Sequence, residues 1–327
     1  MPSWPLSDHF DGRRFVNPTL PEMRAPSLPA ILRMIRERRS RWPAWVENKG
    51  VPKLDAALAS HDVAITFVNH ATFLIQINGM TILTDPVWSK RASPFRWIGP
   101  RRVRAPGVSW EALPRIDVVL LSHNHYDHLD LATLARLKER HSPILLAAAG
   151  DRRILAPIEF RELHELDWWE TFSLDDRGRF TFVPAQHFSA RSLRDRQYSL
   201  WGGYFVESGG RRVYFSGDTG YARHFAAIRQ RLGRPDIALL GIGSYEPRWF
   251  MKPMHMNPIE AVAAHRDLGA RHSIGMHFGT FRLSAESIDQ PVADLECALA
   301  AAGIAETEFV TLEVGETRIY QGDCRSP

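Results

Sequence analysis

Short apolar runs separated by turn residues begin near residue 63 and indicate β-strands. Val63–Asn69 and Thr72–Ile77 are rich in β-branched and aromatic residues, and a third run covers residues 81–83. The last two runs are separated by Asn78-Gly79, a dipeptide that is a strong signal for a hairpin turn. We therefore expect the folded body of the protein to begin with three consecutive short strands.

Apolar runs of strand length continue beyond residue 116 and alternate with segments of helical period. The expected strands cover residues 116–121, 144–148, 179–183, 203–207, 212–216, 237–241 and 272–276. The expected helices cover residues 130–140, 151–156, 222–231, 258–268 and 285–302, with final strands after the last helix. Because the strands fall into two groups with helices between them, we expect two sheets packed face to face with helices outside.

The beginning of the chain is rich in proline and arginine and shows little strand periodicity. We interpret residues 1–60 as an extension packed on a single body that spans residues 61–327. Within the extension, residues 33–41 carry five arginines and one acid. A helix here would place three apolar side chains on one face: Ile31, Ile35 and Trp42. Such a helix fits contact with anionic lipid or an ordinary surface position.

Composition places the chain among globular proteins. It has 327 residues, of which 44% are hydrophobic and 10% aromatic, so it can bury a large core. No apolar run reaches the roughly 18 residues needed to span a bilayer, and the start lacks the features of a secretory signal. Cys297 and Cys324 provide no disulfide framework. We therefore expect a cytoplasmic protein, and the net charge of +4 is too small to predict nucleic-acid binding.

Basic and aromatic residues are concentrated between residues 87 and 107, a segment that contains no acid. Its basic residues are Lys90, Arg91, Arg96, Arg101, Arg102 and Arg104. They are interleaved with Trp88, Phe95 and Trp97. Guanidinium groups suit phosphate geometry and tryptophan suits a membrane interface. The alternative is a solvated loop whose aromatic side chains pack beneath it.

The strongest chemical signal is the segment His123-Asn124-His125-Tyr126-Asp127-His128, an H-x-H-x-D-H cluster. It follows the apolar run at 116–121, so three imidazoles and a carboxylate lie at the end of an expected strand. Imidazole and carboxylate are the ligands that suit zinc or another borderline divalent ion. The pattern predicts a metal site at one edge of a sheet.

Three further candidate ligands, His187, Asp218 and His277, each follow another apolar run. With the first cluster they make a set of five histidines and two aspartates. This set is too large for one tetrahedral ion and is sufficient for two ions that share a carboxylate. Two metal ions about 3.5–4 Å apart are the arrangement that supports a hydrolytic displacement. We therefore predict two zinc ions, with iron or manganese as alternatives.

The constellation resembles the metallo-β-lactamase superfamily and, within it, the N-acylphosphatidylethanolamine-hydrolysing phospholipase D family. The segments that carry the resemblance are NHATFLIQ (69–76), LTDPVW (83–88), SHNHYDHLD (122–130), PAQH (184–187), GDTGY (217–221), PMHMNP (253–258) and MHFGT (276–280). The resemblance implies an α/β fold, the four-layer αββα metallo-β-lactamase sandwich, preceded here by the N-terminal extension.

The resemblance also assigns the metal ligands to two groups. The first zinc ion would be held by His123, His125 and His187. The second would be held by Asp127, His128 and His277. Asp218 would bridge the two ions. His255 matches a histidine near the scissile phosphate, so His255 and Asp127 are the candidate catalytic residues: Asp127 would orient the hydroxide, and His255 would donate a proton or hydrogen bond to the departing alcohol.

The implied activity is a zinc-dependent phosphodiesterase of the phospholipase D type. It would hydrolyse N-acylphosphatidylethanolamine-like lipids to phosphatidic acid and N-acylethanolamine. Candidate substrate contacts are Trp88, Arg101, Arg102 and Tyr126. The implied partners are a phospholipid or small phosphodiester substrate and, peripherally, the inner face of a membrane; relatives in this family form homodimers.

Several alternatives use the same residues differently. A lactonase, or a sugar-phosphate or small-phosphodiester hydrolase of the superfamily, would need the same metal ions and a smaller, more polar pocket. A nuclease would use the same metal ions but would be expected to show a longer basic track or an added clamp domain, and the sequence shows neither. A non-enzymatic metal-binding module would have no need for an activated water. Asp218-Thr219-Gly220 is also an aspartic-protease signature, but that chemistry needs a second copy, which the sequence lacks.

Overall fold

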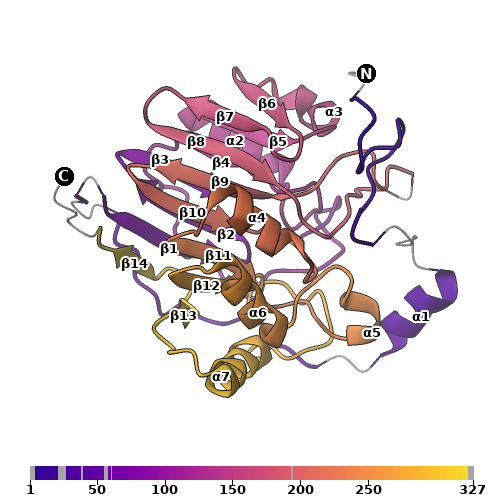
Figure 1. Cartoon of the computed structure of the whole chain (residues 1–327). Coiled ribbons are helices and arrows are strands. Elements are labelled where there is room, and N and C mark those ends of the chain that lie inside the picture. Colours follow the sequence, from indigo (N-terminus) through magenta and orange to yellow (C-terminus); the bar gives the residue numbers. More distant parts are fainter. Residues whose placement is uncertain are drawn as a thin grey trace.

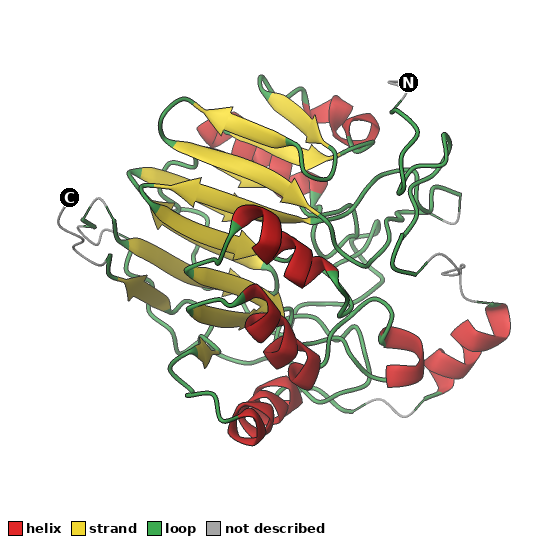
Figure 2. Cartoon of the chain, in the orientation of Figure 1, coloured by secondary structure: helices red, strands yellow, loops and turns green. Residues whose placement is uncertain are grey.

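The computed structural model describes residues 4–20, 27–37, 40–54, 58–59, 61–192 and 194–322. Within these ranges the chain forms two seven-stranded sheets that face each other, with helices on the outer faces (Figure 1, Figure 2). This is the four-layer αββα arrangement of an α/β protein that the resemblance implies, and the fold prediction is confirmed.

The first sheet has the strand order β14-β1-β2-β3-β4-β5-β6. Its strands are β1 (Val63–Asn69), β2 (Thr72–Ile77), β3 (Met80–Thr84), β4 (Val118–Leu120), β5 (Ile144–Ala148), β6 (Leu163–Leu166) and β14 (Thr317–Tyr320). Pairing is antiparallel from β14 to β3 and parallel from β3 to β6. Asn78 and Gly79 join β2 to β3 with φ angles of 48° and 68°, so the expected hairpin is confirmed.

The second sheet has the strand order β13-β12-β11-β10-β9-β8-β7. Its strands are β7 (Thr171–Leu174), β8 (Gly178–Val183), β9 (Gly203–Ser208), β10 (Arg211–Phe215), β11 (Ile237–Gly241), β12 (His272–Met276) and β13 (Phe309–Val310). Pairing is antiparallel from β7 to β10 and parallel from β10 to β13. Strands β8, β10 and β12 therefore run in one direction, and the segments that follow them leave the sheet at the same edge.

Helices cover both outer faces of the sandwich (Figure 1). Against the first sheet lie α2 (Leu131–His141), α3 (Arg152–Leu155) and the 3-10 helix η1 (Ala156–Ile158). Against the second sheet lie α4 (His224–Leu232), α6 (Pro258–Leu268) and α7 (Gln290–Ala302). Between the sheets lies an apolar core that includes the fully buried rings of Phe67, Phe180 and Tyr204. Such dense packing holds the strand ends, and the loops that leave them, in fixed positions.

The helix expected at 285–302 begins only at Gln290. The buried carboxylate of Glu286 accepts hydrogen bonds from the backbone N–H groups of Ser244 and Glu246. These bonds hold the residues before Gln290 in a loop that packs on the segment after β11, and the predicted start of this helix was wrong.

The basic segment 33–41, considered above as a possible helix, is helical only up to Arg36, as part of α1 (Leu28–Arg36). Trp42 lies beyond its end, where the indole N–H donates to the carbonyl of Glu286 at 2.9 Å. The predicted apolar face containing Trp42 was therefore wrong. The side chain of Ile35 and the residues Arg38 and Arg39 lie outside what the structure describes.

The described residues before β1 contain α1 and otherwise lie as loops against the body. His9 Nε2 lies 2.7 Å from Asp167 Oδ1, and the side-chain amide of Asn17 donates to the carbonyl of His187 at 2.7 Å. The division of the chain at residue 60 stays a prediction. Cys297 is a free, exposed thiol, and Cys324 lies outside the described residues. None of the helices in the described ranges has the length and apolar character needed to span a bilayer.

Candidate metal centre

The seven predicted ligands follow the ends of four strands. His123, His125, Asp127 and His128 follow β4, His187 follows β8, Asp218 follows β10 and His277 follows β12. They meet at one edge of the sandwich. Within the described chain, the histidine and aspartate side chains there form four groups, in each of which the possible ligand atoms lie within 4.8 Å of one another. The fold therefore brings together every residue of the predicted ligand set.

His123, His125 and His187 form the first group. His123 Nε2 lies 2.8 Å from His125 Nδ1, and His187 Nε2 lies 3.2 Å from the same atom. Outer hydrogen bonds assign the tautomers of two rings: Nδ1–H of His123 donates to Ser122 Oγ at 2.9 Å, and Nδ1–H of His187 donates to the carbonyl of Met254 at 3.0 Å. The inner Nε2 lone pairs consequently converge on one point, an arrangement that favours a bound cation.

Asp127, His128 and His277 form the second group. Asp127 Oδ2 lies 3.5 Å from His128 Nε2 and 3.4 Å from His277 Nε2. A fourth side chain, His70, was not among the predicted site residues. Its Nε2–H donates to the same Asp127 oxygen at 3.0 Å, which fixes the orientation of the carboxylate.

Asp218 lies between the two groups. Its Oδ2 atom is 3.2 Å from His128 Nε2 and 3.1 Å from His277 Nε2. The same oxygen is 3.9 Å from His123 Nε2 and 3.8 Å from His187 Nε2. A single carboxylate thus faces both sets of imidazoles, which is the position required of a bridging ligand.

A second carboxylate, Asp85, supports the centre from behind. His128 Nδ1 lies 2.6 Å from Asp85 Oδ2, and Ser122 donates to Asp85 from both its backbone N–H and its hydroxyl, at 2.8 and 2.6 Å. All three side chains are fully buried. Asp85 therefore fixes the tautomer of His128 directly and that of His123 through Ser122.

The two inner carboxylates control protonation in the second group. Burial opposes a charge on His277, but the carboxylates of Asp218 and Asp127 outweigh burial and raise its pKa to about 9. The same balance raises the pKa of His128 well above its ordinary value. Burial would raise the pKa of Asp218, yet the nearby imidazoles hold the pKa of that carboxyl well below its usual range. Cations bound here would therefore displace protons from these imidazoles.

Bound metal ions would provide partners for buried nitrogen atoms of this centre that lack hydrogen bonds. Within the described chain, His128 Nε2 and both ring nitrogens of His277 are buried without a hydrogen-bond partner of proper geometry. Burial, followed by repulsion from His128 and other imidazoles, lowers the pKa of His123 well below its ordinary value, so its inner nitrogen keeps a free lone pair. Nitrogen and carboxylate donors in this number suit zinc and neighbouring divalent ions.

His255 approaches the centre from the loop that precedes α6. Its Nδ1 atom lies 3.9 Å from Asp218 Oδ2, and its ring centroid is 5.1 Å from that of His187. The ring is half-buried and lines a small cavity beside His125 and His187. This position allows the imidazole to contact a group bound between the two sets of ligands.

Tyr126 and Arg191 hold the metal-binding segment in place. The Arg191 guanidinium lies 3.9 Å from the centroid of the Tyr126 ring. Its Nη1 atom donates to the carbonyls of Asn124 and Leu129, each at 2.8 Å, and the Tyr126 hydroxyl donates to the carbonyl of Arg191 at 3.0 Å. Sequence reasoning assigned Tyr126 to substrate contact, whereas the observed bonds attach it to the loop after β8.

The other predicted substrate contacts differ in their exposure. Trp88 is half-buried, and its indole N–H donates to the carbonyl of Val108. Arg101 is exposed, but Arg102 is only 4% exposed and donates to the carbonyls of Ser89 and Val87. The buried Arg102 therefore holds the basic segment together and does not present its charge to solvent, contrary to the role expected from the sequence.

Sequence reasoning missed His70, Asp85 and Arg191 as parts of the site. The first two carry the same signal as the predicted ligands, because they follow β1 and β3 directly. Both have positive φ angles, 45° and 32°, in a region that non-glycine residues seldom occupy, and such strain is typical of functional sites. Arg191 carries no local signal, since its bonds to residues 124 and 129 exist only in the folded chain.

Comparison with known proteins identifies the family to which the chain belongs. A family described as "Beta-lactamase superfamily domain" matches residues 80–278. The N-acyl-phosphatidylethanolamine-hydrolyzing phospholipase D 1 of Caenorhabditis elegans is 36% identical over 286 residues, which cover 80% of each chain. The mitochondrial N-acyl-phosphatidylethanolamine-hydrolyzing phospholipase D of Saccharomyces cerevisiae is 36% identical over 249 residues, which cover 74% of this chain and 53% of the yeast protein.

A solved structure with the same fold is Igni18, a metallo hydrolase from the archaeon Ignicoccus hospitalis. It superimposes with a TM-score of 0.61 at 22% identity and covers 80% of this chain and 100% of its own. At this identity the likeness concerns the fold alone. The family match, the nematode relative and the buried histidine–aspartate centre together identify this chain as a member of the metallo-β-lactamase superfamily and a metal-dependent hydrolase.

Proposed function

We propose that the protein is a zinc-dependent phosphodiesterase of the phospholipase D type. Its substrates would be N-acylphosphatidylethanolamine-like lipids, which it would split into phosphatidic acid and N-acylethanolamine. The observation that carries the proposal is the position of Asp218 Oδ2 between two sets of buried imidazoles. The names of the nematode and yeast relatives support the choice of substrate.

Two zinc ions would be held by the residues already grouped here. The first would bind His123, His125 and His187, the second would bind Asp127, His128 and His277, and Asp218 would bridge them. When bound, such ions lower the pKa of water and neutralise charge on a phosphodiester.

The remaining chemistry belongs to side chains of this chain. Asp127, held by the Nε2–H of His70, would orient the attacking water. Burial lowers the pKa of His255 to about 4, so its imidazole is neutral near pH 7. It would donate a hydrogen bond to the departing oxygen of the ethanolamine, because it lies beside Asp218 on the side of the small cavity. Asp85 keeps the imidazole of His128 aligned throughout.

We also propose peripheral contact with a membrane surface through the tip of the basic segment. Trp97 is 74% exposed, and Phe95 and Ile98 are each 52% exposed beside the exposed Arg96. Aromatic and cationic side chains in this combination suit the headgroup region of a bilayer. The homodimer that the resemblance implies stays a prediction.

The experiment is mass spectrometry of products formed by purified, zinc-loaded protein from N-palmitoylphosphatidylethanolamine. We expect phosphatidic acid and N-palmitoylethanolamine in equal amounts, with about two zinc ions bound to each chain. Asp218→Ala, which removes the proposed bridging carboxylate, is the inactive control and should form neither product. Turnover of a lactone or of bis(p-nitrophenyl) phosphate, with none of the lipid, would replace this proposal by a different hydrolase of the superfamily.

A further inference from the structure

A cavity of about 170 Å³ opens directly beside the candidate metal centre. Three of its lining residues are imidazoles of the centre: His125, His187 and His255. Much of the remaining wall is apolar and includes Phe188, Phe250 and Leu283. One end of the cavity therefore lies at the expected position of the scissile bond, and the rest of the cavity is largely apolar.

One wall of this cavity comes from the N-terminal extension. Met34 of α1 lines it, although α1 lies more than 80 residues before the first metal-binding residue. The facing wall includes Phe250 and Met251 of α5 (Arg248–Met251). Figure 1 shows α1 and α5 side by side at the edge of the molecule. The extension therefore takes part in forming the site.

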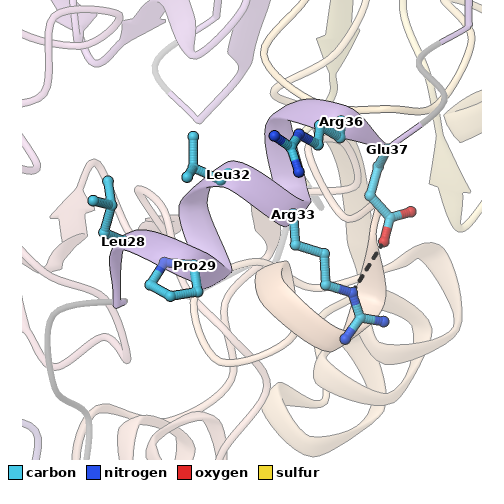
Figure 3. Close-up of a pocket in the computed structure, with 6 residues that line it drawn as sticks. All are labelled: Leu28, Pro29, Leu32, Arg33, Arg36 and Glu37. Atoms are coloured by element: carbon cyan, nitrogen blue, oxygen red, sulfur yellow. Dashed lines mark ion pairs between the residues drawn. The ribbon is translucent and has the colours of Figure 1, made fainter.

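Three side chains attach α1 to α5. The Arg33 guanidinium lies 4.3 Å from the ring centroid of Trp249, whose indole N–H donates to Glu37 Oε1 at 2.8 Å. Arg33 and Glu37 form an ion pair at 3.7 Å, which is drawn as a dashed line in Figure 3. Figure 3 also shows that Leu32 leaves α1 in a different direction from Arg33, and Leu32 is 42% exposed. The helix thus presents one side to α5 and leaves Leu32 outside.

The charge of the cavity indicates which part of a lipid it accepts. None of the described residues that line it is a lysine or an arginine, and Glu246 contributes a carboxylate. The Glu246 carboxylate would repel an anionic phosphatidyl group there. A neutral acyl chain would instead be stabilised, because its apolar surface is removed from water. His255, which is proposed to donate a hydrogen bond to the leaving oxygen, lies in the wall, so the leaving alcohol would be on this side.

Building on the proposed function, we propose that this cavity binds the amide-linked acyl chain of the leaving N-acylethanolamine. Met34 is then a specificity-determining residue, because the size of its side chain sets how much of the chain enters. The glycerol-linked chains and the phosphate would lie on the other side of the metal centre.

The test compares Met34→Trp with wild-type protein on two substrates that differ only in the amide-linked chain, N-acetyl and N-palmitoyl phosphatidylethanolamine. We expect Met34→Trp to lower kcat/KM for the palmitoyl substrate by about tenfold relative to the acetyl substrate. The zinc content of Met34→Trp should equal that of wild type, which shows that the variant keeps its metal centre. Leu32→Trp, on the outer side of the same helix, is the matched control and should leave the ratio unchanged.

Equal effects of Met34→Trp on both amide-linked chains, or a change in preference among glycerol-linked chains, would overturn this assignment. If wild-type protein cleaves bis(p-nitrophenyl) phosphate and neither lipid, the proposed function itself fails.

A second measurement does not depend on turnover or on a large side chain. In a Cys297→Ser, Cys324→Ser background, Met34→Cys should react with maleimide. N-palmitoylethanolamine should slow this reaction several-fold, and N-acetylethanolamine should not. Absence of protection by the long chain would remove the cavity as its binding site.

Discussion

His128 Nδ1 lies 2.6 Å from Asp85 Oδ2, and both side chains are fully buried. This contact leaves the opposite nitrogen of His128 facing Asp218 and the candidate second metal position. A buried imidazole with one nitrogen held in this way has a fixed ring orientation and tautomer, as is typical of metal ligands. Asp85 therefore orients a predicted metal ligand, although it was not itself predicted to bind a metal.

Replacement of Asp85 by asparagine should weaken metal binding. Both oxygens of Asp85 accept hydrogen bonds from Ser122 or His128. In asparagine an NH2 group replaces one of these oxygens, so a donor would face another donor. We expect a loss of about 10- to 100-fold in zinc affinity, measured by elemental analysis after dialysis against a graded chelator. Asp117→Asn is the control, because Asp117 also accepts a backbone N–H but precedes β4, whereas the metal-binding segment follows it. Equal zinc retention by both variants would contradict the orienting role of Asp85.

Arg191→Met should increase the rate at which zinc is lost. The variant keeps much of the side-chain length but removes both hydrogen bonds to the carbonyls of Asn124 and Leu129. The metal-binding segment between them would then sample other conformations. Stopped-flow transfer of zinc to a chromogenic chelator measures this rate. Arg194→Met, at an exposed position in the same loop, should behave as wild type, and a similar rate for Arg191→Met would argue against the clamp.

His255→Gln should affect substrates according to their leaving groups. A departing alkoxide needs stabilisation by a hydrogen-bond donor, whereas p-nitrophenolate leaves without one. We expect kcat for the lipid to fall by about 100-fold or more, with a much smaller change for bis(p-nitrophenyl) phosphate. Steady-state kinetics on both substrates provide the comparison. A uniform fall on both would indicate that His255 stabilises the metal centre and has no role at the leaving group.

The contact of His9 with the body should make stability depend on pH. Burial opposes protonation of His9, but hydrogen bonds with Asp167 and Asp8 outweigh burial and raise its pKa above 6.5. The stabilisation is therefore fully present below pH 6.5 and is lost as pH rises through the higher folded-state pKa. Urea unfolding at several pH values should show this decline in wild type. It should be weaker in His9→Gln, and an identical pH profile for the two would be inconsistent with this contact.

Arg102→Glu should lower stability, whereas Arg101→Glu should weaken vesicle binding and leave stability unchanged. Arg102 is buried against the carbonyls of Val87 and Ser89, so a carboxylate there should lower the free energy of unfolding by about 3 kcal/mol or more. Arg101 is exposed, so its variant should unfold as wild type within about 0.5 kcal/mol. It should, however, bind anionic vesicles less tightly. Thermal unfolding and vesicle co-sedimentation separate the two effects.

The sequence was sufficient to predict those elements that are determined by interactions between residues close together in the chain. The hairpin at Asn78-Gly79 depends on φ angles that these two residues adopt easily, and it forms as expected. The helix Pro258–Leu268 carries its own start signals, with Asn257 as capping residue and Glu260 completing a capping box. The H-x-H-x-D-H segment likewise predicted a metal site, because its candidate ligands are neighbours in the chain.

Short or polar elements were not recognised. Strands β6 and β7 contain four residues each and are only partly buried, so they show neither a continuous apolar run nor a clear alternation. Each exists because it extends the edge of a sheet that longer strands have already formed. Their stability comes from backbone pairing with a neighbour, and a single sequence does not contain that information.

The amino-acid sequence by itself determined the fold class and the set of candidate metal ligands, because strand-end histidines and aspartates follow recognisable apolar runs. Only the tertiary structure decided which groups surround them. Burial separates Arg102 from the exposed Arg101, Asp85 reaches His128 across 43 residues, and Met34 reaches the cavity beside His255. Such relationships depend on the packing of distant segments, in which the desolvation of a charge or the contact of two side chains follows from the whole fold.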